Sequence, residues 1–84
     1  MSNRIHWSDA AKADVRAIDR DAAYGILKGL ARFVKTDVGD IKQLQGFSPP
    51  RFRLRIGDWR VVFRKVGEDE IEIVRVQNRK DVYR

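Results

Sequence analysis

The stretch "RFRLRIGDWRVVF", residues 51–63, limits the folds that this chain can adopt. In residues 51–56 an arginine alternates with an apolar residue, which is the period of a β-strand that buries one face. The pair Gly57–Asp58 favours a tight hairpin turn, and residues 59–66 continue as a second strand with apolar residues at alternate positions. The stretch therefore predicts an antiparallel hairpin with one apolar face and one arginine-rich face.

Further strands are predicted on either side of this hairpin. Residues 67–70, "GEDE", form a second turn, and residues 71–76, "IEIVRV", form a third strand. The apolar positions switch parity between Ile73 and Val74, so this strand is either bulged or buried on both faces. Residues 4–7, "RIHW", alternate between polar and apolar and predict a short first strand.

Two helices are predicted between the first strand and the hairpin. Ser8 is a suitable N-cap for the first helix, and Asp19 or Asp21 can begin the second one. The second helix carries an apolar stripe at helical spacing, formed by Ala23, Ile26, Leu27, Leu30 and Val34. Gly25 and Gly29 weaken this helix, so we expect them where it packs closely against the first helix.

The element order is β-α-α-β-β-β, which indicates an α+β fold in one domain, residues 1–84. We expect an antiparallel sheet of three consecutive strands, the first strand at its edge, and a helical hairpin packed on one face. Residues 36–41 end the second helix, and residues 46–50, "GFSPP", form a loop because proline suits neither a helix interior nor a central strand. Residues 77–84 form a short irregular or helical tail.

The composition excludes several classes of protein. The chain has no cysteine, which removes disulfides, thiol catalysis and thiolate metal sites and fits a reducing compartment. It has no apolar run that resembles a signal peptide or a membrane span, so we expect a cytoplasmic protein without a membrane partner. A net charge of +6 favours a polyanionic partner, and residues 45–84 carry 10 basic but only 6 acidic side chains.

The outward arginines form the main candidate site. Hairpin pairing places Arg53, Arg55 and Arg60 on one face of the sheet. The end of the third strand brings Arg79 and Tyr83 toward the same surface. Guanidinium groups bind phosphate oxygens bidentately and a tyrosine ring stacks on bases, so this face suits single-stranded RNA. The alternative is a solvated basic face that protects the sheet from aggregation.

Other chemically capable residues are weaker candidates. His6, the one histidine, is a candidate base on the first strand, although a structural role is the simpler interpretation. The acidic residues 68–70 belong to a solvated turn, and we expect neither a metal nor a cofactor. The aromatic residues expected in the core are Trp7, Phe47, Phe52, Trp59 and Phe63.

Three segments resemble one protein family: "LQG" at 44–46, "RFRLRIGDWRVVF" at 51–63 and "VQNRKDVYR" at 76–84. They look like the RelE/ParE superfamily of bacterial toxins from type II toxin–antitoxin modules, and they are most similar to its RelE branch. The resemblance implies a ribosome-dependent mRNA endoribonuclease that inhibits translation. Such a toxin cuts mRNA in the ribosomal A site, without a metal, by attack of a ribose 2′-hydroxyl on the adjacent phosphate.

The resemblance also implies roles for individual residues. Arg60 would clamp the scissile phosphate, and Arg79 would stabilise the charge of the transition state. Tyr83 would stack on or orient the nucleotide and is a candidate to take the 2′-hydroxyl proton. Arg53 and Arg55 match a strand pair that is often lysine in the RelE branch; as arginines they stabilise charge but are poor proton-transfer groups. Further RNA contacts are expected from Arg51, Arg64, Lys80 and Arg84.

Two alternatives are open. One is a ParE-like, non-enzymatic inhibitor of DNA gyrase on the same fold, and Tyr83 discriminates because such chains generally lack the combined arginine and tyrosine set. The other is a weakly active homologue that acts mainly with its antitoxin in operon repression. Asn78 stands where many relatives carry histidine, which removes one candidate acid or base. The implied partners are a cognate antitoxin, the ribosome and mRNA, with operator DNA bound only through the toxin–antitoxin complex.

Overall fold

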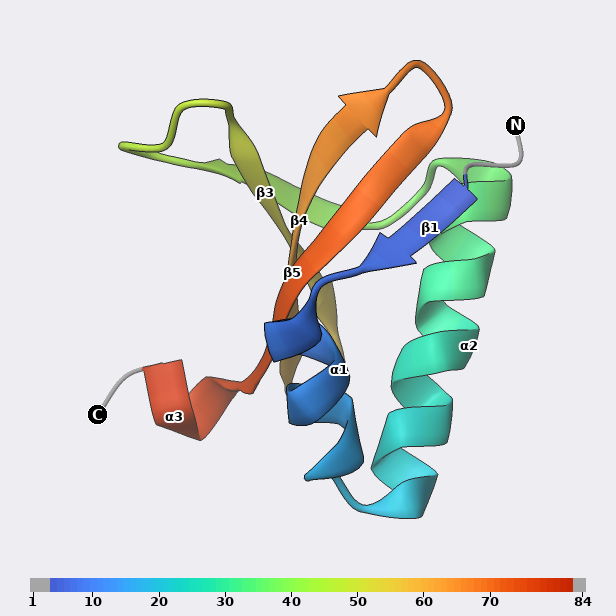
Figure 1. Ribbon diagram of the computed structural model, residues 1–84. Helices are drawn as coiled ribbons and strands as arrows, with labels where there is room; N and C mark the ends of the chain where they lie inside the picture. The colour runs from blue at the N-terminus through green and yellow to red at the C-terminus, as the bar shows by residue number, and fades with distance from the viewer. Residues whose placement is uncertain (1–3, 83–84) are drawn as a thin grey trace.

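The predicted hairpin lies within the sheet of the computed structural model, which describes residues 4–82 (Figure 1). The described residues form, in order, β1 (Arg4–Trp7), α1 (Asp9–Arg16), α2 (Arg20–Thr36), β2 (Asp40–Leu44), β3 (Arg51–Ile56), β4 (Trp59–Gly67), β5 (Glu70–Asn78) and α3 (Arg79–Val82). β3 and β4 pair antiparallel, with Leu54 opposite Val61. Gly57 takes a φ of 58° in the two-residue turn between them, a conformation that glycine adopts at little cost.

The sheet has five strands in the order β1-β5-β4-β3-β2, one more than the sequence indicated. β1 takes its predicted place at one edge, but it runs parallel to β5, so the sheet is mixed rather than wholly antiparallel. A parallel neighbour needs a long crossover in the chain, and all the elements between β1 and β5 supply it. The α+β class is confirmed, as is the antiparallel pairing of β3, β4 and β5.

β2 is a strand that the sequence analysis did not predict. It pairs antiparallel with β3 at the other edge of the sheet. Four of its five residues are exposed, and Leu44 is half-buried. Because an edge strand buries little apolar surface, no alternating apolar pattern marks it in the sequence.

The parity switch in residues 71–76 is a β-bulge. β5 pairs with β4 on both sides of Val74, while Val74 itself has no partner on β4. The extra residue returns both Ile73 and Val76 to the apolar side of the sheet, where both are buried in the core. The bulged alternative is therefore confirmed.

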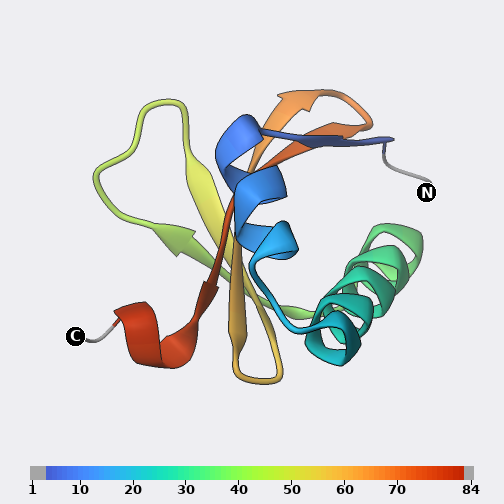
Figure 2. The same ribbon diagram turned by 60° about the horizontal axis from the view of Figure 1, so that its bottom comes forward.

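Helices α1 and α2 pack on the apolar face of the sheet, which we call the inner face. Ser8 caps α1 as predicted, and its Oγ accepts a hydrogen bond from the N–H of Ala11 at 3.0 Å. The core between helices and sheet consists of Ala11, Ile26, Leu30, Phe33, Leu54, Val61, Phe63, Ile71, Ile73 and Val76. In Figure 2, α2 lies on one side of the sheet, while α3 and the loop between β2 and β3 lie on the other. None of the helices within residues 4–82 has the length and apolar character needed to span a membrane.

Two packing predictions for α2 are wrong. Leu27 is 44% exposed, and Phe33, which lies outside the predicted stripe, is buried. A Cβ on Gly25 would meet nothing within 4 Å, whereas a Cβ on Gly29 would lie 2.8 Å from side-chain carbons of Ile56. The close approach at Gly29 is therefore to β3 and not to α1.

Candidate functional site

The outer face of the sheet, opposite the helices, carries the predicted arginines. Arg53 and Arg55 flank the buried Leu54 on β3, and Arg60 stands directly opposite Arg55 on β4. Val62, which lies on β4 opposite Arg53, is 6% exposed. Like charges that face each other across two strands repel, so the folded state alone does not favour this arrangement.

The end of β5 brings Arg79 to the same face. Asn78 Oδ1 accepts a hydrogen bond from the N–H of Lys80 at 2.9 Å, at the start of the four-residue helix α3. The N–H of Arg79 donates to the carbonyl oxygen of Asp58 at 2.9 Å. Since Asp58 lies in the turn between β3 and β4, that turn fixes where Arg79 leaves the sheet.

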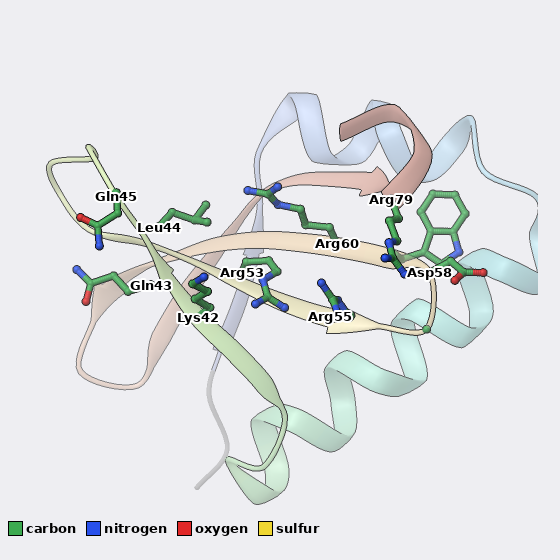
Figure 3. A pocket seen from close by; sticks show the side chains of 11 residues that line it. Lys42, Gln43, Leu44, Gln45, Arg53, Arg55, Asp58, Arg60 and Arg79 are labelled. Atoms are coloured by element: carbon green, nitrogen blue, oxygen red, sulfur yellow. The ribbon is translucent and has the colours of Figure 1, made fainter. Parts of the chain in front are cut away.

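These arginines line one open pocket of about 310 Å³, which we call the arginine pocket. Its wall consists of Lys42, Gln43, Leu44, Gln45, Arg53, Arg55, Gly57, Asp58, Trp59, Arg60 and Arg79. Figure 3 shows these side chains gathered from β2, β3, β4 and the start of α3. Four of the five residues predicted to share a surface are thus brought together. Tyr83, the fifth, lies outside the described residues, as does Arg84.

The positive charge of the arginine pocket is only partly balanced. Nη1 of Arg53 lies 3.5 Å from Oδ1 of Asp40, without a hydrogen bond between them. Nε of Arg60 is also buried, and no described residue accepts a hydrogen bond from it. Among the side chains that the structure describes, Arg55, Arg60 and Arg79 form no ion pair. Buried donors without acceptors are costly, so an anion that supplied acceptors here would bind favourably.

The other predicted RNA contacts that the structure describes, Arg51, Arg64 and Lys80, lie outside the wall of this pocket. Nε of Arg64 donates to Glu72 at 2.8 Å, so a phosphate would compete with that carboxylate. Lys80 is exposed at the start of α3. Arg51 lies over the ring of Phe47, with its guanidinium carbon 4.7 Å from the ring centroid. Phe47 was predicted in the core but is 45% exposed, because its loop lies on the side of the sheet away from α2.

Sequence reasoning missed the wall that β2 contributes. Lys42 stands opposite Arg53, and Leu44 stands opposite Arg51. Both were overlooked because the strand itself was not predicted. The available signal was a strand-length segment bounded by Gly39 and Gly46.

An ion pair outside the arginine pocket holds the strand that leads to Arg79. Asp14 on α1 accepts hydrogen bonds from Nε of Arg75 and from the N–H of Val76, each at 2.8 Å. Burial by itself raises the pKa of Asp14, but the hydrogen bonds from Arg75 and Val76 and the charge of Arg75 outweigh it and hold that pKa below its ordinary value. The same contact raises the pKa of Arg75. Arg75 is thus neutralised within the protein.

The weaker candidates lie away from the arginine pocket. His6 is on β1, at the opposite edge of the sheet from β2, with Nε2 3.5 Å from a carboxylate oxygen of Glu70. Among the side chains that the structure describes, no three carboxylate or imidazole groups are placed so that they could hold a metal ion. Trp7 and Trp59 are half-buried against the core, in agreement with the prediction.

Comparison with known proteins gives both a family and a fold. Residues 5–83 match the model of the ParE toxin of the type II toxin–antitoxin system parDE. A search of curated proteins finds no match. Among solved structures, the fold is similar to a chain of the archaeal RelE–RelB complex from Pyrococcus horikoshii OT3, at 20% identity and a TM-score of 0.73, covering 94% of this chain and 97% of that one.

Two other solved structures show the same likeness. A chain of the toxin–antitoxin complex RelBE2 from Mycobacterium tuberculosis is 21% identical, with a TM-score of 0.74 and coverage of 94% of this chain and 100% of that one. The YoeB dimer from Staphylococcus aureus is 19% identical, with a TM-score of 0.71 and coverage of 92% and 97%. At such identities the likeness establishes the fold, while the match to the family model extends over nearly the whole sequence. The chain therefore belongs to the ParE toxin family of type II toxin–antitoxin systems, within the RelE/ParE superfamily.

Proposed function

We propose that this toxin is a metal-free endoribonuclease that cuts mRNA on the ribosome. The observation that carries the proposal concerns two buried donors, Nη1 of Arg53 and Nε of Arg60, which have no hydrogen-bond acceptor among the described residues. A buried donor left unsatisfied costs on the order of 1–3 kcal/mol, and more when it is charged. A phosphate oxygen would accept a short, charge-assisted hydrogen bond from it. The arginine pocket therefore supports a phosphodiester as the ligand.

In the proposed reaction, the ribose 2′-oxygen attacks the adjacent phosphorus, and the bond from phosphorus to the 5′-oxygen of the next nucleotide breaks. The products are a 2′,3′-cyclic phosphate and a 5′-hydroxyl end. Arg60 would clamp the phosphate and Arg79 would stabilise the developing charge, with Arg53 and Arg55 beside them. Because arginine stays protonated, none of the four removes the 2′-hydroxyl proton. That step is proposed for Tyr83.

An acidic antitoxin is the proposed protein partner. The archaeal relatives were solved as complexes of RelE with RelB. This chain has a net charge of +6, and Arg55, Arg60 and Arg79 form no ion pair with a described side chain, so the arginine pocket would attract a partner rich in carboxylates. Operator DNA would then be bound through the toxin–antitoxin complex.

Cleavage of mRNA by purified protein in a translating ribosome mixture tests the nuclease, with the breaks mapped by primer extension. Arg60→Ala is expected to slow cleavage about 100-fold, the usual effect of removing one donor that stabilises a transition-state charge. Arg32→Ala, exposed on α2, is the matched control and should cut like the wild type. Tyr83→Phe keeps the ring and removes the hydroxyl, which separates stacking from proton transfer. Intact mRNA with the wild-type protein would contradict the proposal.

Inhibition of DNA gyrase is the second candidate, and the match to the ParE family model favours it. In that function the arginine pocket would bind an anionic group without cleaving it. A supercoiling assay run beside the mRNA assay decides between the two. Gyrase inhibition with intact mRNA supports the inhibitor, whereas A-site breaks that vanish in Arg60→Ala support the nuclease. A weakly active homologue would be inert in both assays and would still bind its antitoxin.

A further inference from the structure

We propose that Phe47 and Arg51 form a stacking site for a nucleobase at one end of the arginine pocket. The inference rests on the proposed RNA-cleaving function and adds a base-binding site to the phosphate-binding one. It would give the protein a contact with a base near the scissile phosphate, in addition to the phosphate itself. The expected ligand is an unstacked base of single-stranded RNA.

The register of β2 and β3 places the two residues beside the pocket. Arg51 has the same parity on β3 as Arg53 and Arg55, so it belongs to the outer face. Leu44 stands directly opposite Arg51 and lines the arginine pocket. Because the Phe47 ring lies against the Arg51 guanidinium, the ring adjoins the pocket at its Leu44 end.

The exposure of Phe47 is the second observation. It is 45% exposed, while Phe33 and Phe63 are buried in the core. Its loop joins β2 to β3 and projects from the sheet, as Figures 1 and 2 show. Gly46, the second residue of this loop, has a φ of 83°, a conformation that favours glycine. The loop therefore presents an aromatic ring to solvent next to a cationic pocket.

The chemistry of Phe47 and Arg51 together favours binding of a nucleobase over binding of a second phosphate. An arginine over an aromatic face is a cation–π contact that holds the ring in one orientation. Aromatic rings and guanidinium planes both stack on unpaired bases in RNA-binding proteins. Such stacking tolerates every base, since each has a π face. The site would thus raise affinity without selecting a sequence.

The spacing assigns the stacked base to a neighbouring nucleotide. Arg51 and Arg55 are four residues apart on an extended strand, about 13 Å. That is further than two successive phosphates of one strand are separated. A phosphate held between Arg55 and Arg60 therefore leaves Phe47 to a base beyond the scissile link.

The test compares binding of a short, end-labelled single-stranded RNA with that of the same RNA carrying one abasic position, moved along the chain. Phe47→Ala should weaken binding to the intact RNA roughly tenfold, within the range for loss of one base–aromatic stack. Phe47→Trp should retain the affinity. Phe47→Leu, which keeps apolar volume but has no π face, should resemble Phe47→Ala. Tyr24→Ala removes a ring that is 64% exposed on α2 and serves as the control with unchanged affinity.

The abasic series supplies the deciding outcome. At one abasic position the affinity of the wild type for the RNA should fall about tenfold. At that same position the affinity of Phe47→Ala should be no lower than it is for the intact RNA. Unchanged affinity of Phe47→Ala on intact RNA would overturn the stacking site and leave the nuclease standing. An equal loss at every abasic position would overturn it as well, because the loss would then not depend on a base. A wild-type protein that neither binds nor cuts RNA would remove the proposed function and the stacking site together.

Discussion

The inner and outer faces of the sheet are built from the same strands but differ in how completely their side chains are satisfied. On the inner face, Leu54 and Val61 are 2% and 0% exposed and pack in the core under the helices. On the outer face, their chain neighbours Arg55 and Arg60 face each other, without an ion pair among the described side chains. The inner face stabilises the fold, and the outer face keeps charge available for a ligand.

The pairing of other arginines makes this contrast sharper. Arg64 is paired with Glu72, and Arg75 with Asp14, each at 2.8 Å. Both of these ion pairs lie outside the arginine pocket, where the one described ion pair is the longer contact of 3.5 Å between Arg53 and Asp40. A charge kept merely for solubility would not need buried donors without partners, so this distribution supports a phosphate-binding role.

Leu54 and Arg55 are adjacent in the chain but lie on opposite faces of the sheet. Substituting each of them should give the largest difference in stability between the two faces. Leu54→Ala should lower the free energy of unfolding by about 2–5 kcal/mol, because it removes buried methyl groups and leaves a cavity. Arg55→Ala should change it by less than about 1 kcal/mol, in the stabilising direction, since a like charge opposite Arg60 disappears. Urea unfolding followed by circular dichroism measures both. An Arg55→Ala variant as unstable as Leu54→Ala would show that the faces are not independent.

Alanine substitutions at Gly29 and Gly25 on α2 test how closely the helix packs on the inner face. Their effects on stability should be smaller than that of Leu54→Ala. Gly29→Ala should destabilise the protein by roughly 1–3 kcal/mol, because the new Cβ would lie 2.8 Å from Ile56 carbons. Gly25→Ala meets nothing within 4 Å and should stabilise by up to about 1 kcal/mol through helix propensity. The two melting temperatures should therefore shift in opposite directions. A shift of the same sign would mean that α2 does not approach β3 as closely as described.

Asp14→Asn removes the charge that pairs with Arg75. It should lower the free energy of unfolding by about 1 kcal/mol at pH 7, the smallest destabilisation expected of these substitutions. Asparagine keeps an acceptor for the N–H of Val76 but loses the charge that pairs with Arg75. The folded state lowers the pKa of Asp14, so its contribution is present above the unfolded value near 3.9 and is lost as pH falls through the lower folded value. The stability difference between wild type and variant should therefore narrow below about pH 4.

Urea unfolding between pH 7 and pH 2 measures that narrowing. Asp19→Asn is the control, because the Asp19 side chain accepts no capping hydrogen bond at the start of α2. The free energy of unfolding of Asp19→Asn should stay close to that of the wild type at every pH. A gap for Asp14→Asn that persists unchanged at low pH would show that the lowered pKa is not what stabilises the link between α1 and β5.

Local patterns were enough for the hairpin and much of the site. Alternation predicted which residues of β3 share a face, and the Gly57–Asp58 turn set the register that brings Arg60 opposite Arg55. The capping role of Ser8 followed from its own chemistry and position. These features depend on residues close in sequence. The two-residue period of a strand and the capping requirement of a helix start leave such residues few possible arrangements.

Features that depend on distant residues could not be read in the same way. The sequence by itself determined four of the five described strands, the outward arginines and the resemblance to RelE/ParE toxins. Tertiary structure alone decided that residues 40–44 add a fifth strand, that Lys42 meets Arg53, and that Asp14 pairs with Arg75, 61 positions away. An edge strand takes its conformation from the backbone partners it finds, and an ion pair across two elements depends on how those elements dock. Both features are therefore determined by tertiary packing and not by the local sequence pattern.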